Sequence, residues 1–151
     1  MKIKMLVMDV DGTLTDGSIF IGTNGEIMKA FNVKDGYAIA QLRENNVEPV
    51  IITGRKSEIV EVRAKELGIM ELHQGVSNKL ETLKQIAIKF NCSPSEIAYI
   101  GDDLNDLECI EYVGYSGCPS DAVEEIKNSV SYVCVNSGGH GAVREFINSL
   151  I

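Results

Sequence analysis

The sequence predicts an α/β fold: a single doubly wound, Rossmann-like parallel sheet with helices on both faces, spanning residues 1–151. Two observations lead to this prediction, namely short apolar runs and the amphipathic helical segments that alternate with them. Runs without polar alternation are typical of strands that helices bury on both faces. The expected strands are Met5–Met8, Val50–Ile52, Ile97–Ile100 and Tyr132–Val135, with Val113–Tyr115 as a further candidate.

Helices are expected where apolar residues recur at steps of three and four along the chain. The clearest periodicity runs over residues 80–90, and a second one over residues 143–150 defines a closing helix. Ser93–Glu96 has the pattern of a capping box, with Pro94 at the first helical position. Gly68 lies where a preceding helix needs a left-handed residue at its end.

One segment departs from the alternation of strands and helices. Two extended runs, 18–21 and 27–31, flank Gly22–Gly25, and the pair Asn24-Gly25 is typical of a hairpin turn. We therefore expect an inserted β-hairpin directly after the first strand, with no room for a large cap domain. A lone hairpin is marginally stable in water, so it is expected to pack on another surface, such as a second subunit.

The composition restricts the possible partners and the compartment. A formal net charge of −8 over 151 residues disfavours nucleic acid and anionic membranes as partners. Asp9 interrupts the N-terminal apolar run too early for a signal peptide or a membrane span, so a cytoplasmic location is expected. The four cysteines form no CxxC pair, and reduced thiols are expected in place of a zinc site.

Two carboxylates end the first predicted strand. In Asp9-Val10-Asp11-Gly12-Thr13 the acidic residues are two positions apart, and such residues face the same way in an extended chain. Both would lie at the C-terminal edge of the sheet, where ligands of open α/β folds bind. Close carboxylates repel each other, and a divalent cation removes that repulsion. The alternative is an acidic junction between strand and turn.

A second acidic cluster follows the predicted strand Ile97–Ile100. Gly101–Asp106 brings Asp102, Asp103 and Asp106 to the same edge of the sheet. Hard carboxylate oxygens of this kind suit Mg²⁺. The alternative interpretation is that acidic residues simply favour the first turn of a helix.

Two further segments suit a phosphate group. Thr53, Gly54 and Arg55 follow the strand Val50–Ile52, and a hydroxyl with loop amides at that place can contact an anion. Lys79 lies at a predicted helix start, where it opposes the helix dipole unless an anion offsets it. The alternatives are a helix N-cap by Thr53 or Ser57 and a solvated surface lysine. Together, the four segments supply the groups that phosphoryl transfer needs.

These four segments, in this order, resemble the signature motifs of the haloacid dehalogenase superfamily. The matching motifs are DxDGT at Asp9–Thr13, a threonine at Thr53, a lysine at Lys79 and GDDxxD at Gly101–Asp106. The resemblance implies a Mg²⁺-dependent phosphomonoester hydrolase that works through an aspartyl-phosphate.

The resemblance also implies a role for each motif residue. Asp9 would be the nucleophile, and Asp11 the general acid and base whose backbone carbonyl also faces the metal. Thr53 and Lys79 would bind the phosphate and belong to the catalytic set. The metal would be held by Asp9, Asp11 and Asp102, with Asp103 and Asp106 in support.

Further segments narrow the resemblance to the branch that hydrolyses phosphorylated sugar acids. They are Thr15–Gly17, the hairpin, Phe31–Gly36 and Gly138–Glu145. Members of this branch are tetramers whose hairpins pack together and whose neighbouring subunits help to close each active site, so a homotetramer is implied. Gly-Arg after the second motif favours 3-deoxy-D-manno-octulosonate 8-phosphate as the substrate, with a nine-carbon sugar-acid 9-phosphate as the alternative.

The carboxylate of such a substrate needs cationic or amide partners. The candidates for substrate binding are Thr53, Gly54, Arg55, Lys79, Gly139, His140 and Arg144. His140 stands where many octulosonate phosphatases have arginine. The alternatives are a surface ion pair of Arg55 with Glu58 or Glu61, and a loop histidine with structural partners. Asp35 is expected to contact the substrate or to cap the helix that begins near Gly36.

Two other classes of protein share part of this set of residues. A phosphomutase of the same superfamily usually carries a cap domain, for which this chain has no room. A response-regulator receiver domain also gathers aspartates, a threonine and a lysine around Mg²⁺, but its acidic pair and its phospho-acceptor lie on different strands. Here Asp9 and Asp11 follow the same strand, which favours the hydrolase.

Overall fold

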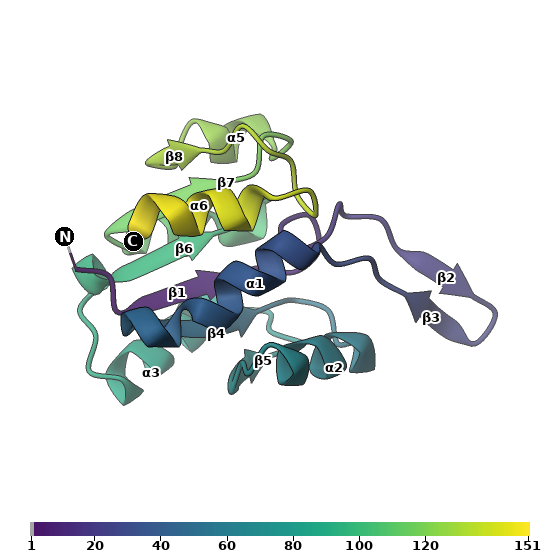
Figure 1. Ribbon diagram of the computed structural model, residues 1–151. Helices are drawn as coiled ribbons and strands as arrows, with labels where there is room; N and C mark the ends of the chain where they lie inside the picture. Colours follow the sequence, from purple (N-terminus) through teal and green to yellow (C-terminus); the bar gives the residue numbers. More distant parts are fainter. Residues whose placement is uncertain (1) are drawn as a thin grey trace.

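The computed structural model describes residues 2–151, which form a six-stranded parallel sheet between layers of helices (Figure 1). The strand order is β5-β4-β1-β6-β7-β8. The chain therefore builds one side of β1 first and then crosses to the other side, so the change of direction lies at β1. The strands are β1 (Met5–Met8), β4 (Glu48–Ile52), β5 (Glu71–His73), β6 (Ile97–Ile100), β7 (Tyr115–Cys118) and β8 (Tyr132–Val133).

Helices cover both faces of this sheet. Leu6 and Met8 of β1 pack in the layer that contains α1, α2 and α6, whereas Met5 and Val7 face α3, α4 and α5. Successive side chains of a strand point to opposite faces, which explains the unbroken apolar run and confirms the doubly wound fold. The helices are α1 (Val33–Gln41), α2 (Glu58–Glu66), α3 (Lys79–Lys89), α4 (Leu107–Tyr112), α5 (Glu124–Lys127) and α6 (Ala142–Leu150).

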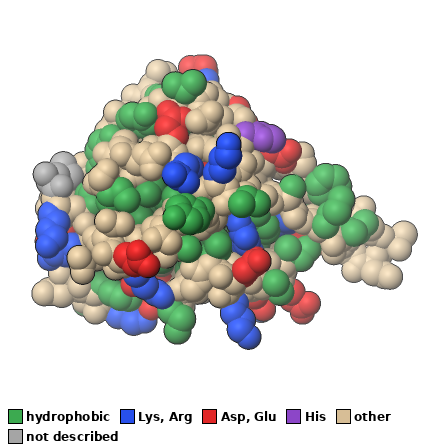
Figure 2. All heavy atoms as spheres, in the orientation of Figure 1, with side chains coloured by type: hydrophobic (Ala, Val, Ile, Leu, Met, Phe, Trp, Pro, Cys, Tyr) green, Lys and Arg blue, Asp and Glu red, His purple; other side chains and the backbone are tan. Residues whose placement is uncertain are grey.

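The expected hairpin follows β1 and consists of β2 (Phe20–Gly22) and β3 (Gly25–Met28), which pair antiparallel. It projects from the body of the molecule beyond the end of β1 (Figure 1). Between β1 and β4, the described chain inserts this hairpin and α1 and has no larger cap domain. Hydrophobic side chains gather on the hairpin (Figure 2); the exposed ones are Ile19, Phe20, Ile21, Ile27 and Met28.

Three local details differ from the sequence-based expectations. The apolar pattern misses β5, because this strand has only three residues and two of them are Glu71 and His73. The seventh strand lies later in the chain than the expected 113–115. The capping box of Ser93–Glu96 is present but opens only a 3₁₀ turn, η2 (Pro94–Glu96), because β6 begins directly after it.

Asp35 connects α1 with α6. Asn32 caps α1, and its side chain accepts hydrogen bonds from the amides of Lys34 and Asp35 at 2.9 and 3.1 Å. The carboxylate of Asp35 is buried and accepts from the amide of Arg144, in the first turn of α6, at 2.8 Å. The expectation that Asp35 caps a helix starting near Gly36 is therefore wrong, because α1 begins earlier and Asp35 caps α6 instead.

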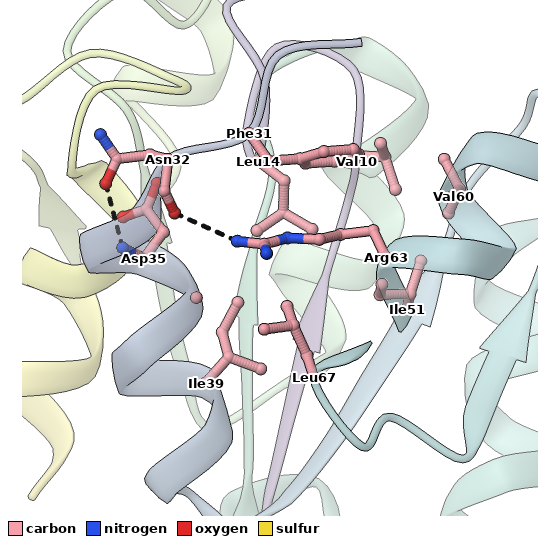
Figure 3. A pocket seen from close by; sticks show the side chains of 11 residues that line it. Val10, Leu14, Phe31, Asn32, Asp35, Ile39, Ile51, Val60, Arg63 and Leu67 are labelled. Carbon is pink, nitrogen blue, oxygen red and sulfur yellow. Dashed lines mark hydrogen bonds between the residues drawn. The ribbon is translucent and has the colours of Figure 1, made fainter. Parts of the chain in front are cut away.

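A small cavity between α1 and α2 contains an unusual polar pair (Figure 3). Arg63 extends into it from α2, and its Nη2 donates to the carbonyl oxygen of Asn32 at 3.3 Å. Asp35 Oδ2 and Arg63 Nε are buried and have no hydrogen-bond partner in the part of the chain that the structure describes. Most buried polar atoms in proteins are paired, so this cavity is the least satisfied polar region of the interior.

The remaining expectations concern membranes and thiols. Among residues 2–151, no helix is long and apolar enough to cross a membrane. All four cysteines are free, which agrees with the expectation of reduced thiols. Burial raises the pKa of Cys109 to about 12, and a buried thiol that stays protonated is unreactive.

Candidate active site

Three neighbouring strands bring the predicted motifs to one edge of the sheet. Asp9 follows β1, Thr53 follows β4, and Asp102 comes shortly after β6. Since β4 and β6 flank β1 on its two sides, these residues converge where open α/β sheets bind ligands. A cavity of about 210 Å³ lies there, lined by Asp9, Asp11, Thr53, Gly54, Arg55, Asp102, Asp103 and Asn105.

Lys79 opens α3 and extends into the acidic cluster. Its side chain is 2% exposed, and its Nζ donates to Asp9 Oδ1 at 2.8 Å and to Asp106 Oδ1 at 2.9 Å. The interpretation of Lys79 as a solvated surface lysine is therefore wrong. Burial by itself lowers the pKa of Lys79, but the two carboxylates together raise it, so the amine stays cationic.

Asp106 is the buried carboxylate that connects Lys79 with the loop after β6. It is fully buried, and its Oδ1 accepts from Lys79 and from the hydroxyl of Tyr99 at 2.5 Å. Its Oδ2 accepts from the amides of Asp102 and Asp103 at 3.0 and 3.3 Å. Four donors use the roughly four lone-pair sites of a carboxylate. Asp106 therefore fixes the loop after β6 and orients Lys79.

Two glycines let the backbone approach these carboxylates. A Cβ atom at Gly101 would lie 2.4 Å from Asp106 Cγ, and one at Gly12 would lie 2.0 Å from Asp102 Oδ2. Gly12 also has a φ of +91°, which favours glycine. Asp102 can lie against the loop after β1 only because this position has no side chain.

Asp9 and Asp102 are the pair that fits a metal ion. Carboxylate oxygens of Asp9, Asp102 and Asp106 lie within 4.8 Å of one another. Burial and then Asp106 raise the pKa of Asp9, and burial and then Asp9 raise the pKa of Asp102 to about 8. Carboxylates that resist ionising together suit a hard divalent cation. Because hydrogen bonds saturate Asp106, Asp9 and Asp102 are the side chains that would hold it.

Asp103 and Thr13 support this pair from the two loops. Thr13 Oγ1 donates to Asp102 Oδ1 at 3.2 Å. Asp103 Oδ1 accepts from the amide of Leu104 at 2.7 Å and caps η3 (Leu104–Asp106). Asp103 is thus the N-cap of η3, and the acidic residue in the first turn is Asp106. The side chain of Asp103 also lines the cavity.

The second strand end places a threonine and an arginine at the cavity. Thr53 is buried, and the N-cap of α2 is Ser57, so the N-cap interpretation is correct for Ser57 and wrong for Thr53. Arg55 Nε lies 4.0 Å from Asp11 Oδ2, and its Nη2 lies 3.7 Å from Glu26. Arg55 therefore faces the cavity and the hairpin, and the expected ion pair with a glutamate of α2 is not formed.

Comparison with known proteins decides the family. The haloacid dehalogenase-like hydrolase family matches residues 56–147. The 3-deoxy-D-manno-octulosonate 8-phosphate phosphatase of Salmonella typhi is 46% identical over 150 residues, which are 99% of this chain and 80% of that protein. The chain belongs to the haloacid dehalogenase-like hydrolases.

Solved structures of similar proteins give the same result for this hydrolase. The 3-deoxy-D-manno-octulosonate 8-phosphate phosphatase of Yersinia pestis has a TM-score of 0.95 and 42% identity, over 98% of this chain and 80% of that one. The enzyme of that name from Moraxella catarrhalis, in complex with magnesium ion, phosphate ion and a KDO molecule, has a TM-score of 0.94 and 40% identity, over 98% and 85%. The family leaves no place for the receiver-domain alternative.

Not every predicted substrate-binding residue of the hydrolase lies at the cavity. His140 and Arg144 line a different hollow together with Lys34, beside the start of α6, and basic side chains lie over this face (Figure 2). The guanidinium of Arg144 lies over the ring of Tyr37, 5.6 Å from its centroid. Within one chain, the structure therefore separates His140 and Arg144 from Asp9.

Gly139 supports the loop after β1. Its amide donates to the carbonyl of Thr13 at 3.1 Å, and a Cβ atom at this position would lie 2.6 Å from the amide nitrogen of Asp16. At the preceding Gly138, a Cβ atom would lie 2.0 Å from the carbonyl oxygen of Gly12. These glycines allow two loops to pack closely, so the structure gives them a packing role.

Sequence reasoning misses four polar residues of the hydrolase site. Tyr99 is hidden in an apolar strand, and Asn105 lies within the fourth motif without a role assigned to it. Glu26 and Lys29 come from the hairpin, where no pattern indicates that their side chains turn back towards the cavity. The only usable signal is a glutamate and a lysine in residues 25–31, which are otherwise apolar. The four residues are Glu26, Lys29, Tyr99 and Asn105.

Proposed function

We propose that this protein is a Mg²⁺-dependent phosphatase that hydrolyses 3-deoxy-D-manno-octulosonate 8-phosphate through an aspartyl-phosphate. The observation that carries the proposal is the convergence of Asp9, Asp102 and Lys79 at the C-terminal edge of the sheet. The identity of 46% to a phosphatase of that name, over nearly the whole chain, supports the substrate. The free thiols fit a cytoplasmic enzyme.

In the first half of the proposed reaction, Asp9 is the nucleophile. A carboxylate oxygen of Asp9 attacks phosphorus, and the bond between phosphorus and the sugar oxygen breaks. Asp11, which lines the same cavity, gives its proton to the departing sugar oxygen, so the product leaves as a neutral alcohol. Lys79 keeps Asp9 in place through the 2.8 Å hydrogen bond, and its charge offsets that of the incoming phosphate.

In the second half, water releases the phosphate. Asp11 takes a proton from the water molecule, whose oxygen attacks phosphorus and displaces the oxygen of Asp9. Inorganic phosphate leaves, Asp9 is a carboxylate again, and Asp11 is protonated for the next cycle. The hydroxyl and amides of Thr53 and Gly54 would contact the phosphate oxygens.

Asp9 and Asp102 would hold Mg²⁺, with the backbone of Asp11 as a further ligand and Asp103 near it. When bound, the ion would neutralise charge on the phosphate and on these carboxylates. A magnesium ion and a phosphate ion in the similar Moraxella catarrhalis structure support this assignment. Arg55 is the cation of the cavity that remains for the carboxylate of the substrate.

The exposed hairpin supports a homotetramer as the working form. Ile21 and Ile27 are 62% and 64% exposed on the two strands of the hairpin, and exposed apolar groups of this kind are typical of subunit contacts. We expect a tetramer in analytical ultracentrifugation, and a smaller species for the double substitution Ile21→Glu with Ile27→Glu. A monomeric wild-type protein at micromolar concentration contradicts this part of the proposal.

Phosphate release from a panel of substrates tests the function. The panel contains 3-deoxy-D-manno-octulosonate 8-phosphate, a nine-carbon sugar-acid 9-phosphate and glucose 6-phosphate, each with Mg²⁺ and with a chelator. We expect the highest kcat/KM for the octulosonate and loss of turnover with the chelator. Equal rates on all three substrates remove the specificity, and unchanged turnover with the chelator removes the metal.

Asp9→Asn is the matched test of the nucleophile. This substitution keeps the shape of the side chain but removes its negative charge, so kcat is expected to fall on the order of 10³-fold or more. The substituted protein should still bind the substrate and remain folded at the assay temperature, although Lys79 loses one of its two carboxylate partners. Normal turnover of Asp9→Asn contradicts the proposed route.

A further inference from the structure

Lys29, at the base of the hairpin, is a buried lysine that contacts Asp11, a residue that lines the cavity. It follows β3, its side chain is 1% exposed, and its Nζ lies 2.6 Å from Asp11 Oδ1 and 3.1 Å from Glu26 Oε2. Burying an ammonium group is costly unless carboxylates compensate it. Lys29 therefore has its position because two carboxylates, one from each side, hold it there.

Glu26 ties this lysine to a third segment of the chain. Its Oε1 accepts a hydrogen bond from the hydroxyl of Ser57 at 2.5 Å, at the start of α2. Its Oε2 lies 3.1 Å from Lys29 Nζ and 3.7 Å from Arg55 Nη2. The hairpin, the loop after β1 and the start of α2 are thus joined around Asp11 by charged groups that no sequence motif contains.

The contacts leave the two oxygens of Asp11 in different situations. Oδ1 is occupied by Lys29, whereas Oδ2 has Arg55 Nε at 4.0 Å, which is too long for a hydrogen bond. The partner of Lys29 is Asp11, the residue that transfers protons in the proposed reaction. This contact therefore bears on the chemistry as well as on the position of the hairpin.

We propose that Lys29 is a positioning residue, which holds Asp11 by one oxygen so that the other oxygen faces the departing group of the substrate. This inference rests on the proposed function and extends it, because it gives the hairpin a part in the chemistry of its own chain. Acid–base catalysis depends on geometry, and a positioned acid contributes about 10²–10⁴-fold. A mobile Asp11 would lose part of that factor without any change in the nucleophile.

The leaving group of the substrate separates this role from simple support of the fold. A sugar oxygen must take up a proton when it leaves, because an alkoxide is a poor leaving group. A nitrophenolate ion leaves from p-nitrophenyl phosphate without a proton, so the first half of the reaction has little use for Asp11 with this substrate. The second half, in which Asp11 activates water, is the same for both substrates. Loss of positioning should therefore lower kcat/KM, which reports the steps up to departure of the leaving group, far more for the sugar phosphate than for the aryl phosphate.

The experiment measures kcat/KM of Lys29→Met on both substrates with Mg²⁺, because kcat/KM does not include the hydrolysis of the aspartyl-phosphate that both substrates share. We expect kcat/KM for the sugar-acid phosphate to fall about 10–100-fold, since part of the acid–base contribution is lost. For p-nitrophenyl phosphate we expect kcat/KM to change by less than about 3-fold. Lys29→Arg, which keeps a cation at this place, should recover part of the rate. Equal losses on the two substrates overturn the inference and leave Lys29 as a support of the fold.

Two controls make the failures distinguishable. Asp11→Asn should lower kcat/KM selectively for the sugar phosphate; if it does not, the proposed role of Asp11 fails, and the inference fails with it. If Asp11→Asn behaves as expected and Lys29→Met does not, only the inference fails. Lys65→Met, on the exposed side of α2, should leave both activities unchanged.

A second variant covers the case in which Lys29→Met does not fold. Glu26→Gln keeps the lysine but weakens one of its two carboxylate contacts, so the same selectivity is expected with a smaller loss. Thermal unfolding followed by circular dichroism checks that the fold of each variant is intact. Unchanged kcat/KM on both substrates for Glu26→Gln, or an equal loss of kcat/KM on both, then overturns the inference.

Discussion

Asp106 and Asp35 are both buried carboxylates beside the start of a helix, yet their surroundings are opposite. Asp106 precedes α4 and accepts four hydrogen bonds, one of them from the cationic Lys79. Asp35 accepts one hydrogen bond, from the amide of Arg144 in α6, and its other oxygen is unpaired within residues 2–151. Both oxygens of Asp106 thus have hydrogen-bond donors, whereas one oxygen of Asp35 has none.

The difference lies in what each region holds together. The groups around Asp106 come from the start of α3, from β6 and from the loop after β6. They lie beside Asp9 and Asp102, which line the cavity. The groups around Asp35 join α1, α2 and α6 beside a small cavity (Figure 3). Two of their buried polar atoms, Asp35 Oδ2 and Arg63 Nε, have no hydrogen-bond partner within residues 2–151. The buried charge of Asp106 is thus compensated by a cation and by hydrogen bonds beside the proposed site, whereas that of Asp35, at the helix junction, is compensated only in part.

The largest effect is expected from Asp106→Asn. An amide group presents two hydrogens where Asp106 now accepts from donors, and it leaves the charge of Lys79 without one of its partners. Breaking a buried charge pair costs about 3–5 kcal/mol, so the free energy of unfolding should fall by that amount. Urea unfolding measures it. Asp103→Asn, an exposed cap, is the control and should cost less than about 1 kcal/mol; equal costs would remove the contrast.

The satisfied region is also the one that sequence reasoning finds. Strand ends of a parallel sheet share one edge, so apolar runs followed by Asp9, Thr53 and Asp102 suffice to bring these residues together. The lysine motif predicts Lys79 by its order along the chain. Each motif specifies a residue type at a set position relative to a strand or helix, so the fold determines where its side chain lies.

The rest of the site depends on how loops cross in space, which periodicity does not contain. Lys29 contacts Asp11 because the base of the hairpin turns back over the loop after β1. His140 and Arg144 belong to a segment close to Asp9 in neither sequence nor register, and they line a different hollow. The short strand β5 is missed because its polar residues break the apolar pattern.

Glu145 provides an intermediate case at the surface. It is half-buried and accepts from the amides of Val135 and Asn136 at 2.8 and 2.9 Å and from the hydroxyl of Tyr132. Burial raises the pKa of Glu145, but these hydrogen bonds outweigh it and lower the pKa below its ordinary value. Glu145→Gln is therefore expected to cost about 1 kcal/mol at neutral pH, because the partners are partly exposed to water.

The pH dependence of that cost has a definite sign. A depressed pKa in the folded state stabilises the protein above the pKa of the unfolded chain, about 4.3 for glutamate, and this contribution disappears as the pH falls through the folded value. The difference between wild type and Glu145→Gln should thus vanish under acid conditions in urea unfolding. Glu124→Gln, whose side chain is 83% exposed, should change stability by less than about 0.5 kcal/mol at any pH. A pH-independent cost of Glu145→Gln would contradict the assignment.

The smallest effect, and the one with the opposite sign, is expected from Asp35→Asn. Burial raises the pKa of Asp35 against the opposing hydrogen bond from Arg144. The ionised carboxylate of Asp35 therefore destabilises the folded protein. The wild-type protein loses stability as the pH rises from about 3.9, the pKa of aspartate in the unfolded chain, through the higher pKa of Asp35 in the folded state. Asparagine keeps an acceptor for the amide of Arg144 and carries no charge, so Asp35→Asn should match or exceed the wild type at neutral pH by up to about 1 kcal/mol.

Asp35→Ala separates the charge from the cap at the same position. Alanine removes the acceptor as well as the charge, and loss of a cap costs about 1 kcal/mol, so this variant should be less stable than Asp35→Asn. Because Asp35 lies outside the cavity of Asp9, phosphatase activity of the folded variants should not change. If Asp35→Asn proves as destabilising as Asp106→Asn, then the two buried carboxylates are compensated equally, and hydrogen-bond count does not distinguish the proposed site from the helix junction.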